Sequence, residues 1–147
     1  MEPLISIRLP GKRQYRPAQT IAWQYQIDAV APHDIQAVEA SILWYTEGKG
    51  ESDMLVHFFE RRVPGTTEVA DLRAMRTITL ALPRSPLTYD GVILKIRWCA
   101  RVKLFMRSGK SFLEEQAFRL GNVPPGRVYP EPGQALTDLA AAVTLRE

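Results

Sequence analysis

The sequence predicts an all-β protein, an antiparallel sandwich or barrel, on the strength of three observations. Apolar and polar residues alternate with a period of two in most segments, which is the pattern of a β-strand with one buried face. Turn-forming residues interrupt these segments at intervals of about ten residues. No segment shows the strong periodicity of a long amphipathic helix. One-sided alternation favours two packed sheets with solvated outer faces, which is a sandwich.

The expected strands follow from these patterns and from the turns between them. In chain order they cover residues 4–9, 19–28, 35–47, 54–62, 77–82, 92–107 and 112–120. Two glycines between residues 48 and 53 predict a hairpin connection. The strand at 54–62 has apolar residues on both faces, so we expect it to be buried on both sides. Loss of periodicity predicts a loop at 63–76, with room for one helical turn at 68–74.

The strand that starts at Val92 is the longest, and the rest of the chain is organised around it. Its even positions are all apolar, and Trp98 is among them, so the indole ring of Trp98 is expected in the core. Most of its odd positions are basic and would form one outward-facing row, which we call the basic ladder. The basic ladder consists of Lys95, Arg97, Arg101, Lys103 and Arg107.

The positive charge of the chain is concentrated in this strand. Residues 91–107 hold five basic residues and no acidic one, so the remainder has 14 basic (19 − 5) against 16 acidic residues. The basic ladder is therefore a candidate binding surface for an anionic partner. The alternative is that acidic side chains on neighbouring strands pair with it. The candidates for such pairing are Glu39, Glu47, Glu60, Glu114 and Glu115.

The length and composition predict one globular domain followed by a tail. A chain of 147 residues is most simply one domain, which we place at residues 1–121. Residues 122–134 contain four of the eleven prolines and predict a proline- and glycine-rich tail over 122–147. A short amphipathic helix could form at 135–146. The lone Cys99, the lack of a membrane-spanning apolar run and the lack of a secretory pattern predict a cytoplasmic protein.

No catalytic or metal-binding signature is present in the sequence. His33 and His57 have no cysteine or carboxylate at metal-ligand spacing, and His57 is expected to be a hydrogen-bonded structural residue. Arg97 and Arg101 could lower the pKa of the Cys99 thiol, but an inert structural cysteine is preferred because no histidine signature accompanies it. The sequence therefore predicts a protein that is not an enzyme and needs no cofactor.

Two features that could suggest nucleotide or nucleic-acid binding do not fit the corresponding motifs. Gly109–Ser111 looks like the end of a phosphate-binding loop, but Leu104 stands where that motif requires a glycine. We expect a hairpin turn there instead. Phe105 is the only aromatic residue among the outward-facing charges, which is too little for a base-stacking surface. Nucleic acid is therefore not an expected partner.

Two segments resemble the arrestin clan. Residues 15–21, Tyr-Arg-Pro-Ala-Gln-Thr-Ile, are similar to the turn that opens the second strand of arrestin-like N-terminal lobes, with Ala18 in place of the usual glycine. Residues 82–91 and the strand sequence at 95–102 resemble the proline-containing turn of the family and the strand that follows it. The resemblance covers one lobe, about residues 3–120, and implies an immunoglobulin-like β-sandwich that serves as an adaptor or scaffold.

These observations lead to two expected functions. The first is a non-enzymatic adaptor that binds a protein partner, either through the basic ladder and the tail or by self-association or strand addition at a sheet edge. The second is a peripheral membrane module whose basic ladder contacts anionic headgroups. The two differ in their response to salt, because headgroup attraction is screened whereas apolar contacts are not.

Overall fold

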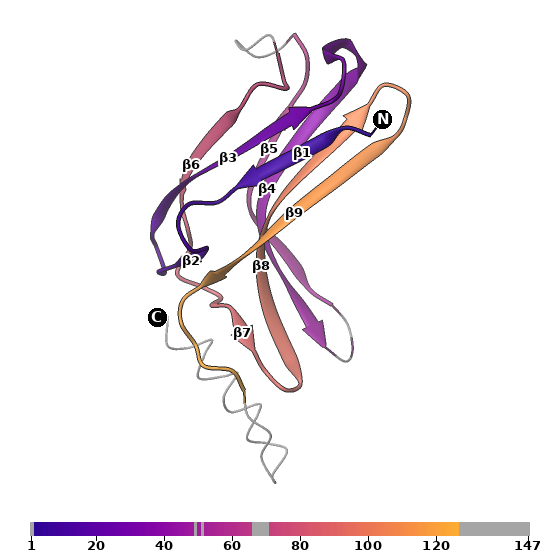
Figure 1. Cartoon of the computed structure of the whole chain (residues 1–147). Coiled ribbons are helices and arrows are strands. Elements are labelled where there is room, and N and C mark those ends of the chain that lie inside the picture. Colours follow the sequence, from indigo (N-terminus) through magenta and orange to yellow (C-terminus); the bar gives the residue numbers. More distant parts are fainter. Residues whose placement is uncertain (1, 49, 51, 66–70, 127–147) are drawn as a thin grey trace.

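The computed structural model describes residues 2–48, 50, 52–65 and 71–126. Within them the chain folds into two β-sheets (Figure 1). The strands are β1 (Leu4–Arg8), β2 (Gln14–Tyr15), β3 (Thr20–Asp28), β4 (Ile35–Gly48), β5 (Met54–Arg62), β6 (Arg76–Ala81), β7 (Tyr89–Asp90), β8 (Leu94–Met106) and β9 (Ser111–Leu120), and a single 3-10 turn, η1 (Pro32–Asp34), precedes β4.

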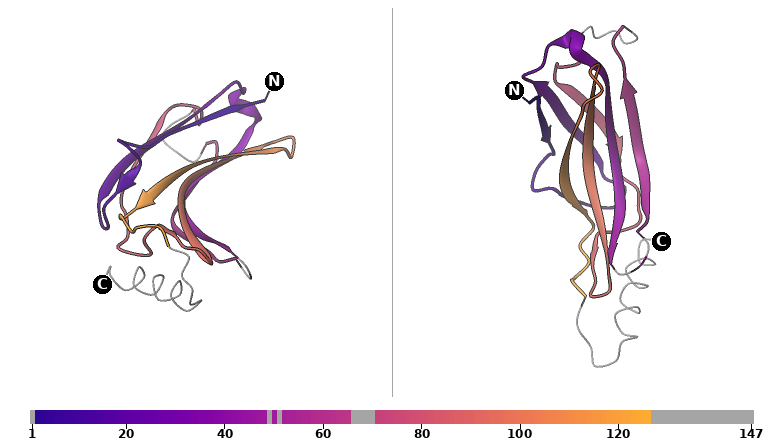
Figure 2. Two further views of the ribbon diagram at one scale, coloured as in Figure 1. Left: turned by 60° about the horizontal axis from the view of Figure 1, so that its bottom comes forward. Right: turned by 90° about the vertical axis from the view of Figure 1, so that its right-hand side faces the viewer.

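The two sheets pack face to face, as Figure 2 shows from the side. The smaller sheet has the strand order β1-β3-β6. The larger sheet has the order β2-β9-β8-β4-β5, and β7 pairs with β8 beside this path. All pairs are antiparallel except β2 with β9, which is parallel. The prediction of an all-β sandwich is confirmed.

The core lies between the sheets, where the alternation predicted it. On β3 the four inward positions from Ile21 to Ile27 are almost completely buried, and on β8 so are the even positions from Ile96 to Leu104. Trp98 is 1% exposed, and its Nε1 donates a hydrogen bond of 2.7 Å to the carbonyl oxygen of Pro86. The predicted core position of Trp98 is therefore confirmed.

The larger sheet extends past the smaller one at the end that carries β7 (Figure 1). The chain that leaves β9 covers part of this extension: Val123 packs against Tyr89 and Ile96, and the amide of Gly126 donates to the carbonyl of Asp90 at 2.7 Å. The predicted tail starts at residue 122. Its part from residue 127 onward, with the predicted helix at 135–146, lies outside the described residues.

The turn before β3 is of a type in which glycine is preferred at the position that Ala18 occupies. The amide of Gln19 donates to the carbonyl of Arg16 at 3.1 Å, which closes a β-turn with Pro17 and Ala18 in the middle. Ala18 has φ = 65°. A proline followed by a residue with positive φ defines a type II turn, in which glycine is preferred because it has no Cβ.

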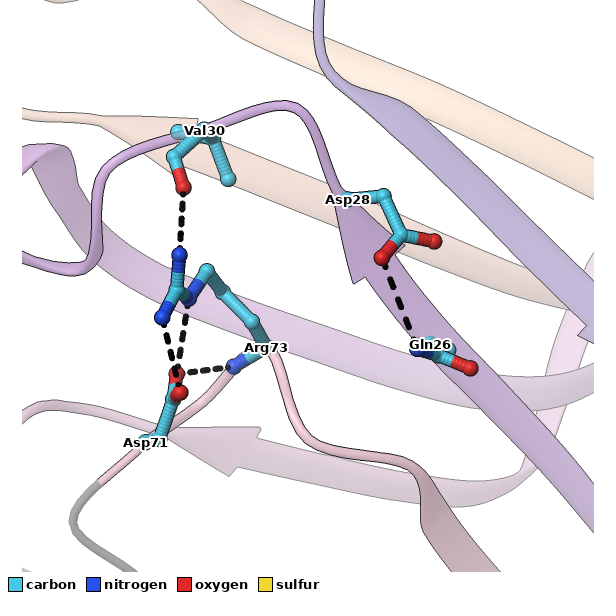
Figure 3. Close-up of polar contacts among 5 residues, drawn as sticks. All are labelled: Gln26, Asp28, Val30, Asp71 and Arg73. Atoms are coloured by element: carbon cyan, nitrogen blue, oxygen red, sulfur yellow. Dashed lines mark hydrogen bonds and ion pairs between the residues drawn. The ribbon is translucent and has the colours of Figure 1, made fainter.

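The predicted loop at 63–76 is described only at its two ends, so the helical turn at 68–74 lies partly outside the described residues. At its C-terminal end Arg73 connects the loop to the end of β3 (Figure 3). Its guanidinium donates to the carbonyl of Val30 at 3.1 Å and to the carboxylate of Asp71 at 3.0 Å. Nearby, the side-chain amide of Gln26 donates to the carboxylate of Asp28 at 3.4 Å.

The prediction for the strand at 54–62 is wrong in one respect. The strand exists as β5, but it is an edge strand and is not buried on both sides. Met54, Leu55, Val56 and Phe59 are 56%, 60%, 43% and 54% exposed. An apolar pattern on both faces is common to central and edge strands, and only the sheet order distinguishes them.

Candidate functional site at the edge strand and outer face of the larger sheet

The free edge of β5 is the first part of the candidate site. Among the described strands, β5 pairs only with β4, so the main-chain groups along its other side have no strand partner. Leu55 lies opposite Trp44 and shares its face, whereas Val56 and Phe59 point to the outer face. The sequence of β5 contains neither proline nor lysine, which natural edge strands use to prevent pairing with other chains.

An irregularity in the pairing of β4 with β5 changes the faces along the strand. The register shifts between Ile42 and Leu43, and His57 has no partner on β4. Such an extra residue is a β-bulge, and it turns the following side chains to the opposite face. The result is that apolar side chains project to both faces of the edge.

Polar side chains connect β5 to the smaller sheet, both to its edge strand β6 and to β3 beside it. The guanidinium of Arg76 donates two hydrogen bonds to Glu60, of 3.1 and 2.6 Å, and these bonds raise the pKa of Arg76. His57 Nε2 lies 2.9 Å from the carbonyl oxygen of Ala81, so His57 is the hydrogen-bonded structural histidine that was predicted. Arg62 donates to the hydroxyl of Tyr25 at 3.3 Å. These contacts hold the edge in place.

Lys95, Arg97, Arg101 and Lys103 of the basic ladder lie on the outer face of β8, whereas Arg107 follows the end of that strand at Met106. Two of the members on the strand are paired. Arg101 lies opposite Glu115 on β9 and donates to its carboxylate at 2.7 and 2.8 Å. Arg97 forms an ion pair of 3.0 Å with Asp90 and lies 3.7 Å from Glu47. The alternative of internal pairing therefore holds for Arg97 and Arg101, through two of the predicted glutamates.

Asp90 is a charge partner that the sequence analysis did not name. It accepts a hydrogen bond of 2.9 Å from Arg119 in addition to the ion pair with Arg97. The hydrogen bond from Arg119, followed by the charge of Arg97, lowers the pKa of the Asp90 carboxyl below its ordinary value of 3.8. The signal was the Tyr-Asp-Gly turn itself, because a turn that precedes a strand brings its residues beside that strand.

The other members of the basic ladder have different surroundings. Lys103 Nζ lies 5.0 Å from the ring centroid of Phe105, and the guanidinium of Arg61 lies 5.5 Å from the same ring, which are cation–π contacts. Arg107 donates to the main-chain carbonyl of His33 at 2.8 Å. Lys95 and Lys103 form no ion pair with any residue that the structure describes.

Cys99 is buried between the paired arginines. Its side chain is shielded by neighbouring outer-face residues, and the residue is 3% exposed. Burial, helped by the nearby charge of Glu115, raises the pKa of the Cys99 thiol to about 12 and outweighs the opposing effect of Arg101. The thiol is therefore protonated at neutral pH, which does not suit a nucleophile.

Two further observations concern the described part of the chain as a whole. No group of three or more histidine, cysteine, aspartate or glutamate side chains is placed there to hold a metal ion. Among the residues that the structure describes, no helix has the length and apolar character to cross a membrane.

Comparison with known proteins shows the fold and no more. No protein-family model matches the chain, and no curated protein matches it. Among solved structures, the sporulation control protein Spo0M from Bacillus subtilis superposes with a TM-score of 0.57 at 13% identity, over 82% of this chain and 49% of Spo0M. The chain thus spans about half of Spo0M. A superoxide reductase (neelaredoxin) from Ignicoccus hospitalis has a TM-score of 0.46 at 14% identity, over 80% of each chain.

Spo0M has an arrestin-like fold, which agrees with the resemblance seen in the sequence. At this identity the likeness concerns the fold alone. The neelaredoxin match is too weak to carry an argument about activity.

The sequence analysis missed the exposed apolar residues of β5 as a candidate site. The available signal was the combination of a two-sided apolar run with flanking charges, Asp53 before it and Glu60 to Arg62 after it.

Proposed function

We propose that this chain is a non-enzymatic interaction domain of the arrestin clan, which binds a protein partner in the cytosol by strand addition to β5. The observation that carries this proposal is the free edge of β5 with apolar side chains on both faces. In strand addition the main-chain groups of the edge supply hydrogen bonds, and side chains at alternate positions supply specificity.

The surroundings of β5 support binding at this edge. Exposed apolar edge strands are hazards that proteins usually blunt with charge, proline, a bulge or a covering segment, and residues 54–59 include the bulge at His57 but no aspartate, glutamate, lysine or arginine. The contacts of Glu60, His57 and Arg62 with the smaller sheet hold the edge rigid before a partner arrives. A preformed edge loses less conformational entropy on binding.

A protonated, buried Cys99 supports the non-enzymatic part of the proposal, because the chain has no other cysteine and a thiolate is the reactive form. The same unpaired, buried thiol is compatible with a reducing compartment such as the cytosol.

The second candidate is a peripheral membrane module that uses the basic ladder. The ammonium groups of Lys95 and Lys103, which form no ion pair with the described residues, favour it, since each basic residue near an anionic surface contributes about 1 kcal/mol. The ion pairs of Arg97 and Arg101 weigh against it, because their charges are already balanced by Asp90 and Glu115. Binding of a protein partner through the basic ladder also stays a prediction, and the same ion pairs of Arg97 and Arg101 weigh against it.

The test uses the full chain as bait in cytosolic extract, followed by identification and purification of the captured protein. Hydrogen exchange is then measured on the purified pair. Strand addition predicts that the amides of residues 54–62 become protected and that Leu55→Lys with Phe59→Lys abolishes binding. Arg97→Glu with Arg101→Glu serves as the comparison for the basic ladder. Protection at β8 without protection at β5 would contradict the proposal.

A parallel arm measures flotation with vesicles of phosphatidylcholine and phosphatidylserine. Flotation that fades with added salt and is lost in the Arg97→Glu, Arg101→Glu variant would support the membrane module instead. The control variant is Leu113→Lys on β9, where the leucine is 50% exposed, close to the exposure of Phe59.

A further inference from the structure

We infer that residues 135–146 form a helix that packs on the inner face of the larger sheet, where this sheet extends past the smaller one. The inference goes beyond the proposed function and does not rest on it, because it concerns another surface and adds no strand to β5. Three observations carry it. They are the path of residues 121–126, the apolar inner face of the extension, and the sequence of the remaining 21 residues (147 − 126).

Residues 121–126, which we call the strap, carry the chain from the end of β9 onto this inner face. Val123 in the strap packs against Ile96, which is 5% exposed and belongs to the inner face of β8. At the end of the strap the amide of Gly126 donates to the main-chain carbonyl of Asp90 on β7 at 2.7 Å. The chain therefore already covers part of the inner face of the extension with its own residues.

The end of the strap is fixed at the turn between β7 and β8. A Cβ atom on Gly126 would lie 2.9 Å from the Cα of Gly91 and 3.2 Å from the hydroxyl oxygen of Tyr89, so this close approach requires glycine. Pro124 and Pro125 restrict the backbone just before it. Because β7 pairs only with β8 among the described strands, the next residues start at one margin of the inner face.

Beyond the strap, the inner face of the extension is apolar and only partly covered. Trp44 on β4 packs against both the main core and the cluster of Tyr89 with Ile96, yet it is only partly buried. Leu94 at the start of β8 is also partly buried. None of the inner positions of these two strands is charged. They are Trp44, Thr46 and Gly48 on β4, and Leu94, Ile96 and Trp98 on β8.

The chain beyond the strap contains a segment with the complementary pattern. Leu136, Leu139, Ala140 and Val143 stand at positions i, i+3, i+4 and i+7, so they form one apolar stripe on a helix. An isolated helix of about 12 residues is marginal in water, and most helices in proteins are stabilised by packing of their apolar face. The segment thus needs an apolar surface, and the inner face of the extension offers one.

The dimensions of the segment and of the surface agree. A helix over residues 135–146 is about 18 Å long. The inner face of the extension measures about 16 Å along β8 over residues 94–98 and about 14 Å across the strands β7, β8 and β4. Residues 127–134 reach up to about 26 Å when extended, so the helix can lie anywhere on this face. A tethered segment acts at an effective concentration in the millimolar range, which favours it over an unattached partner.

The first experiment uses Trp44 as a reporter in the full chain. The other two tryptophans, Trp23 and Trp98, are 0% and 1% exposed, so quenching of fluorescence by acrylamide reports mainly on Trp44. Leu139→Glu with Val143→Glu places two carboxylates on the apolar stripe. Because burial of these charges on an apolar face is unfavourable, we expect this variant to lose the shielding of Trp44 and to show a steeper quenching plot.

The matched control is Ala141→Glu with Leu145→Glu. It adds the same two charges at the same spacing, but on the side of the helix opposite the stripe. We expect its quenching plot to follow that of the wild type. Hydrogen exchange at residues 135–146 should be slowed by about tenfold or more in the wild type and the control, and this protection should be lost in the stripe variant. Thermal unfolding checks that all three proteins are folded.

The second experiment locates the helix by disulfide cross-linking within the full chain. Cys99 is buried and its pKa is raised to about 12, so introduced cysteines are the reactive thiols. Leu94→Cys is combined in turn with substitutions on the stripe and with Ala141→Cys as the control. The stripe substitutions are Leu136→Cys, Leu139→Cys, Ala140→Cys and Val143→Cys. The yield of disulfide within one chain is expected to peak on the stripe and to be absent at position 141.

The outcomes separate this inference from the proposed function. Equal quenching of Trp44 in the wild type and the stripe variant overturns the inference. A disulfide that joins two chains, with a yield that rises with protein concentration, overturns it as well, because the helix of a second copy then lies on this face. Both results leave the proposed function standing. A chain that shields Trp44 but shows no protection of β5 with any captured protein supports the inference and overturns the proposed function.

Discussion

The carboxylate of Glu60 on β5 accepts two hydrogen bonds from the guanidinium of Arg76 on β6, and this pair joins the edges of the two sheets. Neither strand pairs with the other through its backbone. The sandwich is therefore closed along this side by side chains. The side-chain contacts leave the outer edge of β5 accessible and hold it in one position.

Substituting Arg76 by alanine should weaken this connection. We expect the free energy of unfolding to fall by about 1 kcal/mol, because a two-pronged arginine–carboxylate pair at a partly exposed site lies at the upper end of surface ion pairs. We also expect the substitution to speed hydrogen exchange at β5 relative to the wild type, and to do so more than at β3. Arg8→Ala on β1 is the control, since Arg8 makes no ion pair within the described chain. Equal exchange at β5 in wild type and variant would show that the pair does not hold the edge.

The ion pair of Arg101 with Glu115 can be tested by exchanging the two charges. Arg101→Glu alone places two carboxylates opposite each other on β8 and β9, and we expect it to destabilise the fold by roughly 1 kcal/mol. Adding Glu115→Arg should recover most of the loss. Urea unfolding of the two single variants and the double variant gives the coupling energy. Additive effects would mean that the pair contributes nothing in solution.

The sequence predicted β8 well because the two faces of that strand differ in kind. Its even positions are apolar over its whole length, and the structure buries those from Ile96 to Leu104. Pairing on the outer face was foreseeable in part: the hairpin at Gly109 sets the register that puts Arg101 opposite Glu115. The partner Asp90 depends on the short β7, whose two residues give no periodic signal.

The burial of β5 could not be derived from the same kind of pattern. Alternation reports which side chains share a face, but it does not report how many strands lie beyond a given strand. The apolar residues of β5 satisfy the pattern of a central strand, yet they stand at the end of the strand order. The arrestin-like resemblance did not resolve this, because it concerned residues 15–21, 82–91 and 95–102 and none of the residues of β5.

Ala18→Gly should stabilise the protein. Ala18 holds φ = 65° in a type II turn, and a left-handed conformation costs a residue with a Cβ about 1–2 kcal/mol. Glycine removes this cost but has more freedom in the unfolded chain, so we expect a net gain of about 0.5–1 kcal/mol. Ala22→Gly, at an exposed position in β3, should instead lower stability. Denaturant unfolding measures both. A loss of stability in Ala18→Gly would refute the turn assignment.

The Cys99 thiol should be inert in the folded protein. A pKa of about 12 against an ordinary value of 9.0 leaves on the order of a thousandfold less thiolate at neutral pH. We expect labelling by a thiol reagent to proceed at the rate of global unfolding and to become rapid in urea. Cys99→Ala should leave partner binding unchanged. Rapid labelling of the native protein would reopen the possibility of a reactive cysteine.

Asp90 should give the fold a dependence on acid pH. Its pKa is lowered in the folded state, mainly by the hydrogen bond from Arg119 and then by the charge of Arg97. A carboxyl with a lowered folded pKa contributes its full stabilisation above its ordinary pKa of 3.8, and that contribution is lost as pH falls through the folded value. Asp90→Asn should therefore be less stable than wild type at neutral pH, by about 1 kcal/mol.

The difference between the two proteins should vanish in acid. Urea unfolding from about pH 2 to pH 7 measures this difference in the free energy of unfolding. Protonation of Asp90 removes its negative charge in the wild type, as the substitution does in the variant. Glu114→Gln is the control, since Glu114 lies on the adjacent β9 and forms no ion pair with described residues. Its unfolding curve should follow that of the wild type at every pH. A constant gap between wild type and Asp90→Asn would show that the two arginines stabilise the fold through packing and not through the charge of Asp90.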